Sequence, residues 1–287
     1  MAYRKLWPVI GVLLMTVLAC GTSINLPATD LKTGPTVTED IQIGAPDAES
    51  VDLTIELGAG KLNLNPGAES GLLEGTVMYN VADFKPVIEE NGSQVSISMG
   101  NIEFEGIPSF GEEVVNEWDL ALGTMPMSVN ITAGAYAGRY DFGGLSLENL
   151  RVEDGAADVY LDFSSPNQSE MAFLDYQTGA SSVEIANIGN ANLTSMVFIS
   201  GAGDYKLDFA GEWQRDANVK IETGLSNMTI SFPAGLNVKL TFSGGLANVS
   251  TRGTWSVTGD VYSLSGEGPT LTITLDMGAG NLELVAP

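Results

Sequence analysis

The stretch ISGAGDYKLDF, residues 199–209, decides the fold, because it places runs of alternating apolar and polar residues on either side of Gly-Ala-Gly. Nearly the same phrase recurs as LTIELGAGKLNL at 53–64, LRVEDGAADVYLDF at 150–163 and LTITLDMGAGNLEL at 271–284. Alternation with a period of two is typical of a β-strand with one buried face. The sequence therefore predicts pairs of strands that meet at a glycine-centred corner.

The corner glycines recur at nearly constant intervals, and from Gly134 to Gly245 the successive spacings are 21, 24, 22, 23 and 21 residues. Apolar residues stand five and three positions before each glycine, and in most repeats also four and six positions after it; the series weakens at Gly138, Val249 and Thr251. Because the step from three before to four after is odd, a straight strand would turn the second run outward. The corner must redirect the chain so that both runs face one interior. We expect glycine there because tight corners often need a positive φ.

Two architectures fit this repeat. In a β-solenoid each repeat is one coil and equivalent strands stack in parallel, whereas in a sandwich or meander the corners are hairpins between antiparallel strands. Near-constant spacing with apolar residues in phase favours the solenoid. The sequence therefore predicts an all-β protein, a single-chain β-solenoid with about 21–24 residues per coil and an irregular N-terminal β cap.

The less regular part of the chain, residues 51–118, is predicted to be the cap, and residues 119–287 to hold the solenoid repeats. VSISMGNIEF at 95–104 is expected to form a partial coil inside the cap. The last run, at 270–285, is expected to form a closing strand pair. Caps are needed because open solenoid ends expose sheet edges that invite polymerisation.

The N-terminus, MAYRKLWPVIGVLLMTVLAC, has a basic start, a short apolar run and small residues before a cysteine, which is the pattern of a secretory signal. Residues 1–19 are therefore predicted to be a signal peptide. Its end, Val17-Leu18-Ala19-Cys20, resembles the bacterial lipobox, which implies cleavage between Ala19 and Cys20, diacylglycerol on the Cys20 sulfur and acylation, for example with palmitate, of the new N-terminus. The alternative is a plain secretory signal or a short anchor helix with an incidental cysteine. Residues 20–50, rich in Thr, Pro, Asp, Ser and Gly, are predicted to be a lipidated flexible tether.

The charge balance excludes several classes of function. The chain has 36 Asp and Glu against 12 Lys and Arg, so nothing is available to neutralise nucleic-acid phosphates. It has no histidine, which removes the commonest general base and most zinc sites, and the lone cysteine is assigned to lipid. Acidic pairs suited to glycoside hydrolysis are abundant but expected by chance. We predict that the protein is not an enzyme and needs no cofactor.

Two groups of residues could nevertheless bind a ligand. Asp141, Asp162 and Asp208 all lie seven residues after their corner glycine, so stacked coils would align them, and Ca²⁺ could relieve their repulsion. The alternative is a solvated acidic face. Sugars could stack on aromatic residues, although such residues more often pack in a core or cap; the candidates are Trp118, Trp213, Trp255, Tyr136, Tyr140 and Tyr205.

A resemblance to a known family rests on two stretches. VDLTIELGAGKLNLNPGAESGLLEGTVMYNVADFKPVI, from residue 51, and NEWDLALGTMPMSVNITAGAYAGRYDFGGLSLENLRVEDGAADVYLDFSSPN, from residue 116, resemble the toast-rack family of bacterial envelope proteins. The shared features are the GAG corner, a LLEG-type strand followed by Lys-Pro, the Trp-Asp-Leu before the coils and repeated L-x-V-x-x-G-A. The resemblance implies a β-helix-like domain, often lipid-anchored, similar to the C-terminal domain of membrane proteins that respond to cell-wall antibiotics and to adhesin-like solenoids. It implies no catalytic residues.

Together these features predict a non-catalytic, lipid-anchored extracytoplasmic scaffold, either adhesin-like or an accessory to envelope stress responses. The alternative is a carbohydrate- or cation-binding module on the cell surface. The predicted partners are a membrane, reached through lipid on Cys20, and an envelope protein or glycan. The predicted location is the extracytoplasmic face of the cell membrane or the outer membrane.

Overall fold

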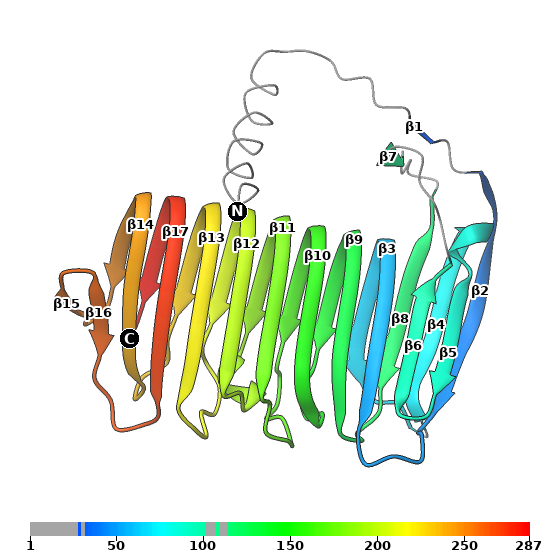
Figure 1. The fold of residues 1–287 in the computed structure, drawn as a ribbon, viewed down its shortest axis with the longest axis horizontal. Coiled ribbons are helices and arrows are strands. Elements are labelled where there is room, and N and C mark those ends of the chain that lie inside the picture. The colour runs from blue at the N-terminus through cyan, green and yellow to red at the C-terminus, as the bar shows by residue number, and fades with distance from the viewer. Residues whose placement is uncertain (1–27, 30–31, 70, 101–106, 109–113) are drawn as a thin grey trace, which may run out of the picture.

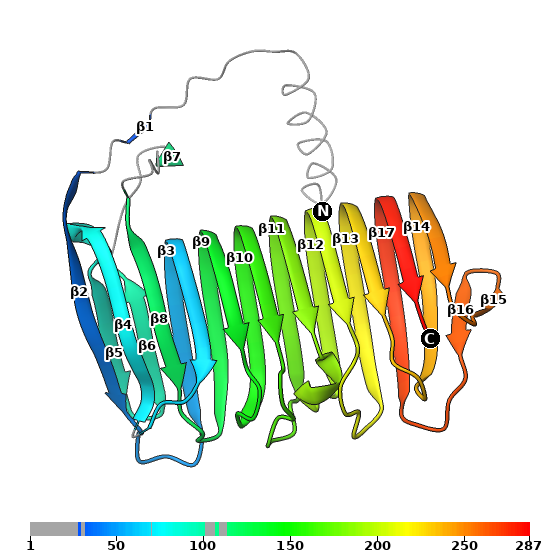
Figure 2. The ribbon, with the colours of Figure 1, turned by 180° about the vertical axis from the view of Figure 1, so that it is seen from behind.

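The structure of the chain, a computed structural model, describes residues 28–29, 32–69, 71–100, 107–108 and 114–287. The described residues form β-strands with two short 3-10 turns, η2 (Ala82–Phe84) and η3 (Ile188–Ala191). Figure 1 shows the strands as a long row of narrow arches, and Figure 2 shows the same row from behind. The predicted all-β solenoid is confirmed.

Eight long strands make the coils of this row. Each has 14–16 residues, bends at its corner glycine and pairs in parallel with its neighbours. They are β3 (Val51–Pro66), β9 (Met127–Asp141), β10 (Leu147–Asp162), β11 (Phe173–Ala186), β12 (Ser195–Asp208), β13 (Ala217–Ser231), β14 (Asn237–Arg252) and β17 (Thr270–Val285). The halves before the corners form one sheet and the halves after the corners form a second, here called the first sheet and the second sheet.

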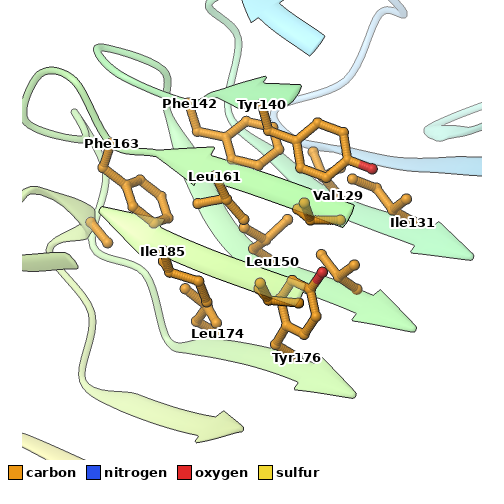
Figure 3. Packing of buried hydrophobic residues seen from close by; sticks show 14 of the residues in the cluster. Val129, Ile131, Tyr140, Phe142, Leu150, Leu161, Phe163, Leu174, Tyr176 and Ile185 are labelled. Atoms are coloured by element: carbon orange, nitrogen blue, oxygen red, sulfur yellow. The ribbon is translucent and has the colours of Figure 1, made fainter. Parts of the chain in front are cut away.

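The core lies between these two sheets. The residues five and three positions before each corner glycine and four and six positions after it are almost all buried. Each corner thus redirects the chain so that both halves of the strand face one interior, as predicted. In β10, for example, Leu150, Val152, Val159 and Leu161 are all at most 2% exposed. Figure 3 shows Leu150 and Leu161 pointing into the same interior as residues of the neighbouring coils. Burying one such aliphatic side chain stabilises the fold by about 1.5–3 kcal/mol.

The corner glycines are explained by close packing of neighbouring coils. A Cβ on Gly224 would lie 2.6 Å from the carbonyl oxygen of Gly201, and one on Gly278 would lie 2.8 Å from that of Gly224. Positive φ, which we expected at the corners, occurs instead two residues later in three coils, as at Gly203 (φ 156°). The expectation of positive φ at the corner glycines is therefore wrong, and the lack of a side chain is what the stack requires.

The last coil lies out of sequence order. In the sheet, β17 is inserted between β13 and β14 and pairs in parallel with both. The prediction of a closing strand pair at 270–285 is wrong. The chain passes from β13 to β14 by skipping one position in the stack and then returns to fill it. Within β17 the chain still runs from the first sheet to the second, but in going from β14 to β17 it moves back towards the N-terminal end of the stack. The turn from β14 to β17 therefore has the opposite hand to the turns between β9 and β14.

At the N-terminal end the sheets continue past β3 through separate strands. β6 (Gln94–Met99) pairs in parallel with the first half of β3, and β8 (Asn116–Leu122) pairs in parallel with the second half. β6 overlaps the predicted partial coil at 95–104, of which residues 101–104 lie outside the described residues. Together β6 and β8 cover β3 as one divided coil. β3 itself is a full coil, although its residues fall within the predicted cap. β1 (Ala28–Thr29) and β7 (Ile107–Pro108) form a separate two-stranded pair.

Antiparallel strands complete the cap. In the first sheet, β5 (Pro86–Asn91) pairs with β6 through a tight hairpin whose two turn residues are Gly92 and Ser93. In the second sheet, β4 (Gly71–Val81) pairs with β8, and β2 (Thr33–Gly44) pairs with β4. Residues 33–44 therefore form a strand, which corrects the predicted tether of 20–50. β2 is held because Ile41 and Ile43 bury their side chains and Tyr79 donates a hydrogen bond to Glu39 at 2.9 Å.

At the C-terminal end a small hairpin covers part of the last coil. β15 (Ser256–Thr258) and β16 (Val261–Leu264) pair antiparallel, and β16 pairs antiparallel with residues Val238–Thr241 of β14. This hairpin extends the first sheet beyond β14. After Phe242, β14 enters the second sheet. There, no strand in the described part of the chain pairs with its outer edge.

Candidate functional site

Cys20, the predicted lipidation site, and Ala19, which precedes the predicted cleavage point, lie outside the described residues. Within the described residues, no helix has both the length and the apolar character needed to cross a bilayer. The anchor therefore stays a prediction from the sequence.

The structure aligns two of the three predicted acidic residues. Asp141 and Asp162 are register partners on β9 and β10. Ala186 of β11 is the next register partner of Asp162, so Asp208 of β12 lies one coil farther away. The three carboxylates therefore do not form one continuous row.

Each of these carboxylates binds the next coil. Asp141 Oδ2 accepts a hydrogen bond from Ser164 Oγ at 2.8 Å, and Asp162 Oδ1 accepts one from Asn187 Nδ2 at 2.7 Å. Asp208 Oδ1 likewise accepts one from Ser231 Oγ at 2.8 Å. The described residues contain no group of three or more His, Cys, Asp or Glu arranged to hold a metal ion. The observed role of these aspartates is to tie the turns of adjacent coils together.

Other charges on the outer faces also pair between coils. Arg139 of β9 lies 3.0 Å from Asp158 of β10, and Lys206 of β12 lies 3.2 Å from Glu184 of β11. These side chains are largely exposed, so each pair contributes at most about 1 kcal/mol. Their arrangement adds to the alignment of the coils, and Glu184 and Lys206 also line a small hollow of about 150 Å³.

The most unusual polar cluster lies inside the corner of β9, β10 and β11, and no pattern in the sequence predicted it. Asp154, half-buried in β10, accepts a hydrogen bond from Tyr176 Oη at 2.8 Å and another from Thr178 Oγ1. Tyr136 Oη and Ser181 Oγ lie 3.4 Å from its carboxylate. Four hydroxyl groups from two neighbouring coils thus converge on one carboxylate.

The electrostatics of this cluster follow from burial. Burial raises the pKa of Asp154 above its ordinary value, although the hydrogen bonds from Thr178 and Tyr176 act in the opposite direction. Burial, with the negative charge of Asp154, also raises the pKa of Tyr176 well above its usual range. Tyr140 donates to Tyr136 Oη at 3.0 Å and extends the network inward. Through these hydrogen bonds the cluster joins three coils.

The aromatic residues considered as sugar platforms pack in the core or the caps. Trp118, Tyr136, Tyr140 and Tyr205 are at most 6% exposed. Trp213 stacks on Phe209 with ring centroids 6.1 Å apart, and Trp255 meets Phe232 edge-on at 5.5 Å. The packing interpretation of these residues is confirmed.

Among the described residues, two of the larger hollows lie near the ends of the stack. One, of about 590 Å³, lies over the outer face of the first sheet, and its lining is mostly carboxylate, amide and hydroxyl groups from Asp52, Thr54, Glu89, Asn91, Gln94, Ser96 and Asn130. The other, of about 400 Å³, lies at the C-terminal end among Trp255, Leu236, Leu264, the loop 233–235 and the final residues 286–287. The first is polar and the second mainly apolar.

Comparisons with solved structures support the fold. A proposed cell adhesion protein from Clostridium sporogenes is 21% identical, has a TM-score of 0.53, and aligns over 88% of this chain and 100% of its own. A proposed adhesin from Bacteroides fragilis is 8% identical with a TM-score of 0.42, over 90% of this chain and 100% of its own. At these identities only the first likeness carries weight, and it concerns the fold alone.

Among curated proteins no significant match exists. A family model described as "N-terminal domain of toast_rack, DUF2154" matches residues 32–186 and 167–231. These two ranges overlap and together cover more than half of the chain, including β2 to β13. The chain therefore belongs to the toast-rack family.

Proposed function

We propose that this protein is a non-catalytic scaffold, anchored by lipid on the extracytoplasmic face of a bacterial membrane, with an adhesin-like role or a role in envelope stress. One observation supports it most strongly: the polar side chains of the stack bind neighbouring coils, as Asp141, Asp162 and Asp208 do. A stack built this way presents long, rigid faces to a partner. The lipobox-like sequence before Cys20 supplies the anchor.

The anchor is tested by labelling growing cells with an alkyne fatty acid. We expect the wild-type chain to carry the label and Cys20→Ala to lose it, while Ser23→Ala, three residues away, keeps it. A wild-type chain without label, or a labelled Cys20→Ala variant, would contradict lipid anchoring.

The non-catalytic role is tested by complementation. Cells that lack the protein are expected to become more sensitive to cell-wall antibiotics, and wild type is expected to restore resistance. Asp141→Asn, Asp162→Asn and Asp208→Asn should restore it equally, because a scaffold needs no reacting carboxylate. Loss of complementation by one of these variants at an unchanged protein level would point to chemistry at that residue.

A second candidate function is glycan binding, which the polar hollow of about 590 Å³ favours. Its carboxylates, amides and hydroxyls match the hydrogen-bonding groups of sugars. On a glycan array we expect Asn91→Ala and Asn130→Ala to lose any binding that the wild type shows. Asn281→Ala, on the outer face of β17 and outside the hollow, is the matched control and should keep it. A wild-type chain that binds no glycan removes this candidate.

A further inference from the structure

The C-terminal end of the stack is uneven by two strands. The first sheet carries β16 and β15 beyond β14, whereas the second sheet carries none among the described residues. Figure 1 shows the β15–β16 hairpin projecting past β14 at this end. Two strand edges are therefore open there, namely the outer edge of β15 in the first sheet and the outer edge of the second half of β14 in the second sheet.

The inward side chains of these strands are poorly covered. Val257 of β15 and Tyr262 of β16 lie in register with the buried Leu240, so they face the interior of the solenoid as it does. Val257 is nevertheless 52% exposed, and Tyr262 is only partly buried. In the second half of β14 the inward positions hold Val249, which is partly buried, and Thr251, which is exposed, whereas the equivalent residues of β17 are fully buried. The interior is therefore left open on both sheets at this end.

The two open edges match in direction and in height. β15 runs with the first half of β14, because both are antiparallel to β16, and the second half of β14 returns in the opposite direction after its corner. Leu240, in the row of Val257, stands five positions before the corner Gly245, and Thr251 stands six positions after it. These are equivalent inward positions on the two arms of one arch, so Val257 and Thr251 lie at the same distance from the corner.

The free backbone groups of the two edges also match. The backbone groups of successive residues in a strand point to opposite edges. The Asp260 carbonyl oxygen accepts a hydrogen bond from the main chain of β14 at 2.9 Å, so Val261 faces β15 and Val257, next to the register partner of Val261, faces outward. The Arg252 carbonyl oxygen accepts a hydrogen bond at 2.9 Å from the residue that follows β17, so Thr251 faces outward as well.

Charge does not oppose a contact between two copies at this end. Residues 246–264 hold one cation, Arg252, and one anion, Asp260, in a chain of formal net charge −24. Arg252 already pairs with Glu283 of β17 at 2.6 Å and needs no partner from outside the chain. A strongly charged protein repels its own copies over most of its surface, and a surface without net charge escapes that repulsion.

We propose that two copies of the chain join at their C-terminal ends about a two-fold axis parallel to the strands, with β15 of each copy pairing antiparallel with the second half of β14 of the other. The first sheet of one copy then continues into the second sheet of the other. In each sheet, β16 and β15 of one copy fill the space between β14 of that copy and β14 of the other. The two-strand projection of each copy thus fits the two-strand recess of its partner, and both open edges are covered.

The contact has the size and composition of a specific interface. It takes in residues 246–264 of each copy, and about twenty residues a side is near the lower limit of a standard protein–protein interface. Val257 exchanges backbone hydrogen bonds with Thr251 of the other copy, and Val257, Tyr262 and Val249 of both copies enclose a shared interior. The same surface is used by both copies, so the assembly closes as a dimer. The proposal does not depend on the lipid anchor or on the scaffold role.

Disulfide formation between two singly substituted chains tests the contact. The full chain, in a Cys20→Ala background that removes its only native thiol, carries either Thr258→Cys or Ser250→Cys; both positions are exposed. In the proposed contact Thr258 and Ser250 form a non-hydrogen-bonded pair with Cα atoms about 4.5 Å apart, which is within the range of a disulfide. With copper phenanthroline in mild detergent we expect covalent dimer in the mixture and not in either chain alone, because the axis holds like positions far apart.

Thr229→Cys is the matched control for Ser250→Cys. Thr229 lies in the same row as Ser250, two coils farther inside the stack. Mixed with the Thr258→Cys chain, it should give no covalent dimer.

Val257→Lys tests the same contact without a disulfide. Because Val257 is 52% exposed in the single chain, the fold should tolerate lysine, whereas the dimer would enclose its charge. In sedimentation of the Cys20→Ala chain we expect a dimer whose dissociation constant rises about tenfold or more with Val257→Lys. Leu225→Lys, at a 58% exposed residue of β13 inside the stack, is the control and should leave the dimer unchanged.

Three results would each overturn the proposal. The first is no covalent dimer from Thr258→Cys mixed with Ser250→Cys when both variants melt as the parent chain does, and the second is an equal yield with Thr229→Cys. The third is a chain that sediments as a monomer at all concentrations, or as a dimer that Val257→Lys does not weaken. If a cysteine variant melts early, the sedimentation comparison decides.

Discussion

Gly224 shows why the repeat keeps glycine at its corners. The backbones of adjacent coils approach so closely there that a methyl group on one corner would meet the carbonyl oxygen of the next. The sequence indicates the position of these glycines clearly. It cannot indicate the reason, because positive φ and close approach both select glycine, and only the structure separates them.

We predict that Gly224→Ala destabilises the fold by about 1–3 kcal/mol, because its Cβ would be forced against the Gly201 carbonyl oxygen. Gly44→Ala is the control: its Cβ would meet nothing within 4 Å, and the change should stay within about 0.5 kcal/mol. Denaturant unfolding measures both. Equal stability of the two variants would mean that the corners do not pack as described.

Asp154 is a residue whose role no repeat could reveal, because its partners Tyr176 and Thr178 come from the next coil. Its raised pKa means that the folded protein holds a proton that the unfolded chain releases. Stability is therefore fully present below the ordinary aspartate pKa and falls as pH rises through the raised value. Asp154→Asn should remove this fall.

The measurement is the free energy of unfolding of wild type and Asp154→Asn from pH 3 to pH 7, where pH 3 is about one unit below the unfolded pKa of Asp. We expect wild type to lose stability relative to the variant as the pH rises across this window. A constant difference between the two proteins would show that Asp154 titrates in the fold as it does in the unfolded chain.

At the scale of elements, the order β13–β17–β14 reflects how apolar each coil is. β17 has Leu282 and Leu284 at four and six after its corner, both buried, and β14 has Val249 and Thr251 there, which are partly or fully exposed. The more apolar coil takes the inner position, where both of its sides are covered. The sequence shows the weak residues of β14, but not that β17 would move inside it, because sequence order is the default for stacked repeats.

We predict that Leu284→Ala costs about 2–5 kcal/mol, because it removes a fully buried side chain between two coils. Thr251→Ala, at the equivalent position of β14, is exposed and should cost no more than about 0.5 kcal/mol. Chemical denaturation compares them. A large loss from Thr251→Ala with a small loss from Leu284→Ala would place β14, not β17, inside the stack.

For the whole molecule, the sequence predicted the coils because eight corners repeat one local pattern. It predicted the ends poorly because caps are built from long-range antiparallel pairs. Ile41 and Ile43 alternate over too few residues to distinguish β2 from a tether. By contrast, Gly92-Ser93, which forms the turn between β5 and β6, is a dipeptide typical of two-residue hairpins. The aligned aspartates were found from their offsets, but their partners Ser164 and Asn187 lie in irregular turns outside the repeat pattern.

Disulfide trapping within one molecule tests the stacked order most directly. In the Cys20→Ala background, Asn227→Cys with Asn281→Cys should form a disulfide readily, because Asn281 Nδ2 lies 2.9 Å from Asn227 Oδ1 on adjacent coils. Asn227→Cys with Asn248→Cys should not, because β17 separates their strands. The described solenoid would be contradicted if the Asn227→Cys and Asn248→Cys pair formed a disulfide rapidly while the Asn227→Cys and Asn281→Cys pair formed none.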